Sequence, residues 1–187
     1  GKSTTLKSIS GLLKNEDGEI TKGNIFFESN EITKSNPSEI VKNGIFQVME
    51  GRRCIADMTV EENLRLGAHT RNDRGSINKD IEKVLNFFPR LRERKGLSGY
   101  LSGGEQQMLT MCRTLMGDPD LVMIDEPTEG LSPQMVQRVA SLLKEIAKRG
   151  ISTLLVEQKL AIAMNIAHRV YVMGHGKVVF EGSPEEL

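Results

Sequence analysis

The sequence predicts an α/β fold with a mostly parallel sheet and flanking helices. Leu121–Ile124 is a continuous apolar run, as in strands that are buried on both faces of a parallel sheet, and Ser152–Val156 (STLLV) is expected to be a second buried strand. A segment with helical periodicity lies between them, with Val139, Leu143 and Ile146 on one side. This order of strand, helix and strand through the second half of the chain is typical of an α/β domain.

The first half of the chain predicts shorter elements, which its turn and capping residues delimit. We expect, in order, a helix over residues 1–13, a strand over 23–28, a helix beginning near residue 37 and a short strand over 44–48. Asn36 or Ser38 is the expected cap of the second helix. Thr59 and Glu62 match a capping box, which predicts a further helix to about Gly67.

The remaining segments alternate between polar loops and helical stripes. A polar loop is expected over 71–76, a helix ending at Pro89, and a charged, exposed segment over 90–99. Further helices are expected from Gly104, from Pro133 to Gly150 and over 160–167. Residues 170–173 and 177–180 should form a hairpin.

Composition excludes several classes of protein. Lysine plus arginine and aspartate plus glutamate both number 25, so the formal net charge is zero, which argues against a dedicated nucleic-acid binder. The sequence has no apolar run near the roughly 18 residues of a transmembrane helix, and no secretory signal. Cys54 and Cys112 stand apart, as expected for a reduced, cytosolic protein. The 187 residues fit one domain.

The heptapeptide Leu101–Gln107, with the sequence LSGGEQQ, has the features of a phosphate-binding helix N-terminus. Gly103 and Gly104 let backbone N–H groups approach a ligand, and Ser102 adds a hydroxyl donor. The positive end of the helix dipole also attracts an anion. We expect a phosphate group to bind here.

A second phosphate-binding signal stands at the start of the chain, in Gly1, Lys2, Ser3 and Thr4. In a complete P-loop, backbone N–H groups wrap the phosphates, the lysine reaches the β- and γ-phosphates, and the hydroxyl holds Mg²⁺. The full pattern needs a further glycine and the residues between it and Gly1. We therefore expect a longer protein, truncated here within its P-loop, and poor ATP binding by this fragment alone.

Two acidic residues, Asp125 and Glu126, follow the first buried strand. The carboxyl ends of strands form the edge at which α/β sheets bind ligands. At this edge Asp125 can hold Mg²⁺, directly or through water, and Glu126 can take a proton from an attacking water. The alternative is an ordinary strand end with solvated acids, and the P-loop residues make that alternative weaker.

LSGGEQQ, LVMIDEP and the partial P-loop together resemble the nucleotide-binding domain of ABC transporter ATPases, over essentially the whole chain. The resemblance implies two domains that sandwich two ATPs head to tail. Ser102, Gly103, Gly104 and Glu105 would then act on the ATP of a partner ATPase subunit. Gly1, Lys2, Ser3 and Thr4 would bind the chain's own ATP, with Asp125 and Ser3 on Mg²⁺ and Glu126 as catalytic base. Residues 60–115 would form a helical subdomain inserted in this single domain.

The sequence departs from the usual pattern of this family at three places. Counting back from Thr59, the loop glutamine that senses Mg²⁺ is replaced by Glu50, a possible carboxylate ligand, whereas Gln47 falls inside a strand. The histidine that contacts the γ-phosphate is replaced by Gln158, a hydrogen-bond donor without charge. The loop Gly130–Pro133 lacks the usual aspartate, and the three histidines (His69, His168 and His175) lie elsewhere.

Glu-Gly-Arg-Arg at 50–53, Glu-Gly-Leu-Ser-Pro at 129–133 and Val-Glu-Gln at 156–158 resemble one subfamily, the second ATPase of branched-chain amino-acid uptake systems. ATPases of urea and short-amide uptake are a close alternative. A soluble, non-transport ABC ATPase is an alternative of another class, but the chain has no room for its coiled coils. The resemblance implies transmembrane permease partners, no nucleic acid, and a place at the cytoplasmic face of the membrane. The segment from Glu50 to about Tyr100 would receive the permease.

Overall fold

The structure, a computed structural model, describes residues 1–51 and 53–187 of the chain. Arg52, which belongs to the Glu-Gly-Arg-Arg motif, lies outside the described residues. The centre is a parallel sheet in the order β3 (Ile45–Val48), β4 (Leu121–Asp125) and β5 (Ser152–Val156). Ile124 pairs with Val48 on one side and Leu155 on the other, so the carboxyl ends of all three strands meet at one edge.

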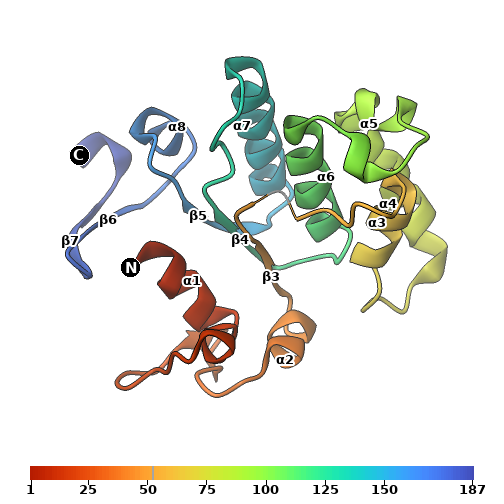
Figure 1. Ribbon diagram of the computed structural model, residues 1–187. Coiled ribbons are helices and arrows are strands. Elements are labelled where there is room, and N and C mark those ends of the chain that lie inside the picture. The colour runs from red at the N-terminus through yellow and green to blue at the C-terminus, as the bar shows by residue number, and fades with distance from the viewer. Residues whose placement is uncertain (52) are drawn as a thin grey trace.

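Helices cover both faces of this sheet (Figure 1). On one face, α6 (Gly103–Leu115) and α7 (Pro133–Lys148) pack with Val122 and Ile124 of β4. On the other, α1 (Lys2–Ile9) and α2 (Pro37–Lys42) pack with Met123 of the same strand. Because successive side chains of a strand point to opposite faces, the continuous apolar run of β4 fills both cores. The predicted fold class is confirmed.

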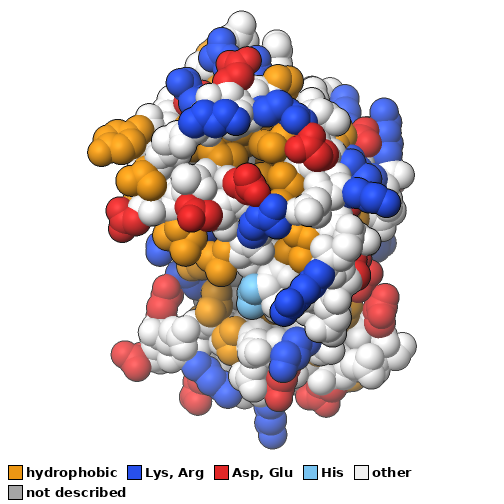
Figure 2. All heavy atoms as spheres, turned by 90° about the vertical axis from the view of Figure 1, so that its right-hand side faces the viewer, with side chains coloured by type: hydrophobic (Ala, Val, Ile, Leu, Met, Phe, Trp, Pro, Cys, Tyr) orange, Lys and Arg blue, Asp and Glu red, His pale blue; other side chains and the backbone are white. Residues whose placement is uncertain are grey.

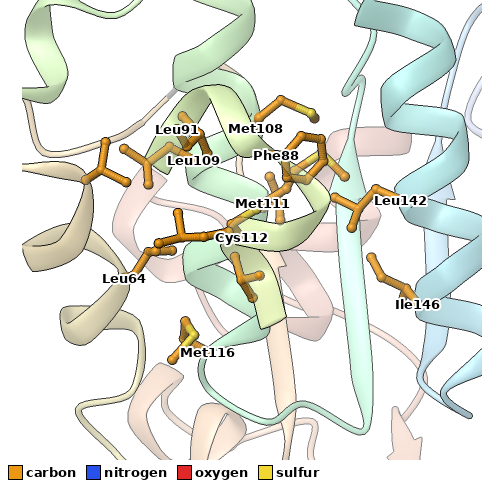
Figure 3. Close-up of a cluster of buried hydrophobic side chains, with 14 of the residues drawn as sticks. Leu64, Phe88, Leu91, Met108, Leu109, Met111, Cys112, Met116, Leu142 and Ile146 are labelled. Carbon is orange, nitrogen blue, oxygen red and sulfur yellow. The ribbon is translucent and has the colours of Figure 1, made fainter. Parts of the chain in front are cut away.

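The elements between residues 60 and 115 are α3 (Val60–Gly67), α4 (Arg74–Phe87), α5 (Pro89–Glu93), a 3₁₀ helix (Ser98–Tyr100) and α6. In Figure 3, Met108, Leu109 and Met111 of α6 lie among the apolar side chains of the neighbouring helices, with Leu142 and Ile146 of α7 beside them. The helices gathered on the right of Figure 1 therefore share one hydrophobic core with the sheet.

The α-helices α2, α3 and α6 each begin with a capping box, where the sequence has strong N-terminal signals. Asn36 caps α2, Thr59 caps α3 and Ser102 caps α6, and each pairs with a glutamate three residues later. Each box satisfies two backbone N–H groups that the first turn leaves without a partner. The predicted starts of these helices are thereby confirmed, and Asn36, not Ser38, is the cap of α2.

Two small antiparallel hairpins stand beside the main sheet. β1 (Phe26–Phe27) pairs with β2 (Asn30–Glu31), and β6 (Val170–Gly174) pairs with β7 (Lys177–Gly182). The remaining elements are α8 (Leu160–Met164) and 3₁₀ helices at Leu13–Glu16 and Pro184–Glu186. The predicted C-terminal hairpin is therefore present.

Several predicted boundaries are wrong. The first helix ends at Ile9, because Gly11 has the left-handed φ of +73°, and α8 ends at Met164. The expected strand over 23–28 is reduced to β1, since Glu28 and Ser29 turn the chain with positive φ. α4 begins inside the expected 71–76 loop, and the segment expected to be exposed over 90–99 buries Leu91 in the core.

Within the described residues, the structure has no helix that is both long and apolar enough to cross a membrane. Figure 2 views the molecule from the side of α3, α4 and α5. On this face hydrophobic patches lie between interspersed Lys, Arg, Asp and Glu side chains.

Candidate functional site

Asp125, Glu126 and Gln158 lie where β4 and β5 end. The backbone N–H of Glu126 donates to the carbonyl of Val156 at 2.9 Å, which continues the ladder between the two strands by one residue. Glu126 has a φ of +45°, in the left-handed region that a residue with a side chain seldom adopts. Such backbone is found where the surrounding structure holds it, as at many functional sites.

The carboxylate of Glu126 accepts a hydrogen bond of 2.5 Å from the side-chain amide of Gln158. The sequence predicted both residues as catalytic, and the fold brings them into direct contact across 32 positions. The amide can donate and accept hydrogen bonds but carries no charge and cannot shuttle a proton. Together the two side chains offer a general base beside a fixed hydrogen-bond donor.

Asp125 is only 4% exposed, and its Oδ1 atom is buried without a hydrogen-bond partner among the described residues. A buried carboxylate oxygen in that condition needs a compensating group, and a divalent cation or a cation-bound water supplies one. No group of three or more His, Cys, Asp and Glu side chains comes together in the described part of the chain. Because Mg²⁺ is usually held by one or two carboxylates together with phosphates and waters, a site that contains Asp125 does not need a larger cluster of acidic side chains.

The start of α1 carries the candidate phosphate-binding residues Gly1, Lys2, Ser3 and Thr4. Gly1 is the N-cap residue of α1, the side chains of Lys2 and Ser3 are half-buried, and the helix has no acidic residue in its first turn. Leu6, 1% exposed, anchors α1 on the sheet face that contains Met123. The free N–H groups at this helix end and its dipole suit a phosphate.

The LSGGEQQ segment forms the N-terminus of α6. Ser102 is the N-cap residue: its Oγ accepts from the N–H of Glu105 at 3.3 Å, and its own N–H donates to Oε2 of Glu105 at 2.8 Å. Arg94 completes the arrangement with two hydrogen bonds to Oε1 of Glu105. Burial opposes ionisation of Glu105, but the Ser102 N–H and Arg94 outweigh it and hold the pKa below the ordinary value.

The carboxylate of Glu105 is thus engaged with its own helix cap and with Arg94, while Ser102 is exposed and Gly103 and Gly104 are half-buried. A Cβ atom on Gly104 would lie 3.0 Å from Cγ of Met135 on α7, so a side chain there would press on the neighbouring helix. The nucleotide contacts predicted for these four residues stay predictions.

The two candidate phosphate-binding segments lie on opposite sides of the sheet. α1 packs in the core that contains Met123, and α6 packs in the core that contains Val122 and Ile124. Figure 1 shows the same separation, with α1 below the strands and α6 above them.

The loop that follows β3 contains Glu50, which is exposed. The fully buried Asn63 organises this loop: its Oδ1 accepts from the N–H of Ile55 at 2.9 Å and its Nδ2 donates to Ser98 Oγ at 3.0 Å. Arg113 of α6 donates to the carbonyl of Arg53 at 2.6 Å. The candidate Mg²⁺ residue Glu50 therefore belongs to a loop that is tied to α3 and α6.

Sequence reasoning missed a second connection between the β4 and β5 ends. Thr128, which is fully buried, donates its hydroxyl proton to Oε2 of Glu157 at 2.6 Å. Oε1 of Glu157 accepts from the backbone N–H groups of Gln158 and Lys159 at 2.9 and 3.0 Å. In the sequence, Glu157 stood out only as the middle of Val-Glu-Gln, with nothing to indicate its partner.

The sequence places the chain among known proteins. Residues 1–129 match the family described as ABC transporter. Over its full length the chain is 38% identical to the high-affinity branched-chain amino acid transport ATP-binding protein BraG of Pseudomonas aeruginosa, of which it covers 78%. It is equally 38% identical to a probable branched-chain amino acid transport ATP-binding protein, LivF, of Archaeoglobus fulgidus, again covering 78%.

Solved structures agree with these relatives. The full chain superposes on a nucleotide-free ATP-binding cassette from an ABC transporter with a TM-score of 0.83 at 28% identity, covering 77% of it. A second cassette, in its ADP conformation, gives 0.82 at 29% identity and the same coverage. Fold and site thus define a nucleotide-binding α/β cassette with its ligand edge at the carboxyl ends of the strands. The chain belongs to the ABC transporter family and is an ABC-type ATPase.

Proposed function

We propose that this ATPase drives an importer for branched-chain amino acids. The contact between Glu126 and Gln158, beside the buried and unpaired oxygen of Asp125, is the observation that carries the hydrolytic role. The solute class is supported by the two relatives named for branched-chain amino acid transport and by the Glu-Gly-Arg-Arg and Val-Glu-Gln sequences.

In this proposal Glu126 takes a proton from the water that attacks the γ-phosphorus, and the bond to the leaving ADP oxygen breaks. Gln158 holds the carboxylate of Glu126 and donates only hydrogen bonds. Lys2 and the N–H groups at the start of α1 bind the β- and γ-phosphates, which are the groups that gain charge in the transition state. The protein's contribution is then orientation and electrostatic stabilisation.

Magnesium fits the donor set of this edge. The buried Oδ1 of Asp125, the hydroxyl of Ser3 and the carboxylate of Glu50 are the oxygen ligands that we assign to it. When bound, Mg²⁺ neutralises phosphate charge. The three ligand residues would determine where the positive charge of the ion lies relative to the phosphates.

We infer that Ser102, Gly103 and Gly104 act on the ATP held by a partner ATPase subunit. Support comes from the sheet, which lies between α1 and α6 and keeps the two phosphate-binding segments of one chain apart. A head-to-tail pair of subunits would bring the α6 N-terminus of one chain to the P-loop of the other.

We also infer that residues 60–115 act as a helical subdomain that docks on transmembrane permease subunits at the cytoplasmic face of the membrane. The mixed surface over α3, α4 and α5 in Figure 2 supports an interface of this kind. On α3 and α4, the large apolar side chains of Leu66 and Phe87 are more than a third exposed.

The test is ATP hydrolysis by the complete protein in a reconstituted complex with its permeases. The solute-binding protein of the system should stimulate ATP hydrolysis when leucine, isoleucine or valine is added. It should not do so when urea or acetamide is added. Glu126→Gln should lower turnover by roughly 10²–10⁴-fold while ATP binding survives.

Stimulation by urea or an amide instead would move the solute assignment to that related class. Full hydrolysis without permeases, and no binding to them, would favour a non-transport ATPase. An unchanged rate in the Glu126→Gln variant would remove Glu126 as the base.

A further inference from the structure

The contact between Thr128 and Glu157 stands directly beside the catalytic pair. Thr128 is two residues after Glu126, and Glu157 is one residue before Gln158. The loops after β4 and β5 are therefore joined twice by side chains, at 2.5 Å from Gln158 to Glu126 and at 2.6 Å from Thr128 to Glu157. A backbone bond from Glu126 to Val156 and a longer one of 3.3 Å from Lys159 Nζ to the carbonyl of Thr128 complete the connection.

Glu157 uses both of its oxygens in this connection. One oxygen accepts from Thr128, and the other accepts from the backbone N–H groups of Gln158 and Lys159. The peptide that carries Gln158 is thus fixed relative to the loop that carries Glu126. The bonds to Gln158 and Lys159 would be enough to order the turn before α8. The additional bond to the fully buried Thr128, 29 residues earlier, connects this turn to the loop after β4.

We propose that Glu157 and Thr128 are positioning residues for hydrolysis: they hold the turn after β5 so that the amide of Gln158 stays on the carboxylate of Glu126. This inference rests on the proposed roles of Glu126 and Gln158. Neither positioning residue needs to touch ATP. We call the hydrogen bonds that Glu157 makes to Thr128 and to the turn after β5 the brace. Because catalysis by oriented groups is sensitive to displacements near 1 Å, loss of the brace should lower turnover and leave ATP binding unchanged.

Two substitutions of Glu157 distinguish the effect of its hydrogen bonds from the effect of its negative charge. Glu157→Gln removes the negative charge but keeps an oxygen that can accept from the two N–H groups, and its amide can donate to the Thr128 hydroxyl. Glu157→Ala removes every bond. If Glu157 acts through geometry, the glutamine variant keeps its rate and its pH–rate profile and the alanine variant does not.

The experiment measures kcat and KM for ATP with Mg²⁺ in the complete protein. Thr128→Val and Glu157→Ala should each lower kcat by about 10–100-fold with KM unchanged, and the double variant should be no worse than either alone. Thr128→Ser and Glu157→Gln should stay near wild type. Ser141→Ala and Glu145→Ala are matched controls that should leave kcat unchanged, because they remove a hydroxyl from an exposed position and a carboxylate from a partly exposed position of α7.

Thermal melting and ATP binding establish that each variant is folded at the assay temperature. Thr128→Val is nearly isosteric, so it decides the matter if Glu157→Ala is too unstable to assay. Wild-type kcat in Thr128→Val and Glu157→Ala overturns the inference, as does a Glu157→Gln variant as slow as Glu157→Ala. Glu126→Gln is measured in parallel: if it stops hydrolysis while the brace variants are normal, only the brace fails, and if it is fully active, the proposed function fails.

Discussion

The side-chain amide of Gln158 donates a hydrogen bond to the carboxylate of Glu126 at the point where two neighbouring strands end. Each side chain therefore restricts the orientation of the other. A carboxylate that accepts a short hydrogen bond is held in one orientation, ready to receive a proton from the opposite side. An uncharged donor achieves this without adding a positive charge to the proposed phosphate site. At this position geometry, rather than charge, is the contribution that we assign to the side chain.

Replacement of Gln158 tests that assignment. Gln158→His keeps a ring N–H donor and should retain hydrolysis, whereas Gln158→Leu has no donor and should lose most of it, by about 10–100-fold in kcat. Steady-state ATPase assays of the two variants at the same pH give the comparison. Equal rates for histidine and leucine would take Gln158 out of the catalytic site.

Individual residues also show where prediction from sequence stops. Asp125 and Glu126 could be proposed because they follow a buried apolar strand at the edge where parallel sheets bind ligands. Gln158 could be proposed only from the family resemblance, which implies a histidine at its position. Thr128 and Glu157 could not be paired, since their contact spans 29 positions and depends on how two loops fold back. The hydrophobic periodicity of a sequence contains no information about a contact of this kind between two loops.

At the scale of the elements, local chemistry decides where helices begin better than where they end. Asn36, Thr59 and Ser102 each cap a helix with a glutamate three residues on, and that spacing is visible in the sequence. Helix ends depend on single backbone angles, such as the positive φ of Gly11, and on packing that no short pattern contains. Leu91 is one case, buried within a run of charged residues.

The conformation of the LSGGEQQ segment depends on the N-terminal cap of α6. Arg94 stabilises this cap through its ion pair with Glu105. Arg94→Met leaves the buried carboxylate without its cation and should lower the free energy of unfolding by about 1–2 kcal/mol at neutral pH. Glu105 has a pKa below its ordinary value of 4.5, so its ionised form stabilises the fold above that pH. This contribution is lost as the pH falls through the folded pKa.

The loss caused by Arg94→Met should therefore shrink as the pH falls below 4.5 and through the lowered pKa of Glu105, because a protonated Glu105 no longer needs the cation. Urea unfolding of both proteins above and below pH 4.5 measures it. Arg92→Met is the matched control, since its partner Glu82 is largely exposed, and it should change stability little at any pH. A loss for Arg94→Met that is constant with pH would contradict the role given to Glu105.

At the scale of the whole molecule, the sheet determines what one chain can and cannot do. The sequence predicts β4 as a strand because Leu121–Ile124 is apolar throughout, but a run that is buried on both faces does not indicate which helix covers which face. The structure supplies that assignment: α1 lies on the Met123 side and α6 on the Val122 side. The trans arrangement, first suggested by family resemblance, thereby gains a physical reason in this chain.

A covalently linked pair of copies separates action in trans from action in cis. Lys2→Ala disables a P-loop, and Ser102→Arg places a bulky cation at the exposed start of α6. If Ser102 acts on the partner's ATP, Lys2→Ala in the first copy and Ser102→Arg in the second damage the same site. The other site stays intact, so about half of the wild-type ATPase rate should remain under independent sites. Both changes in one copy should damage both sites and abolish hydrolysis. Action in cis gives the opposite pattern, with activity only when both changes share a copy, and that result would refute the proposed arrangement.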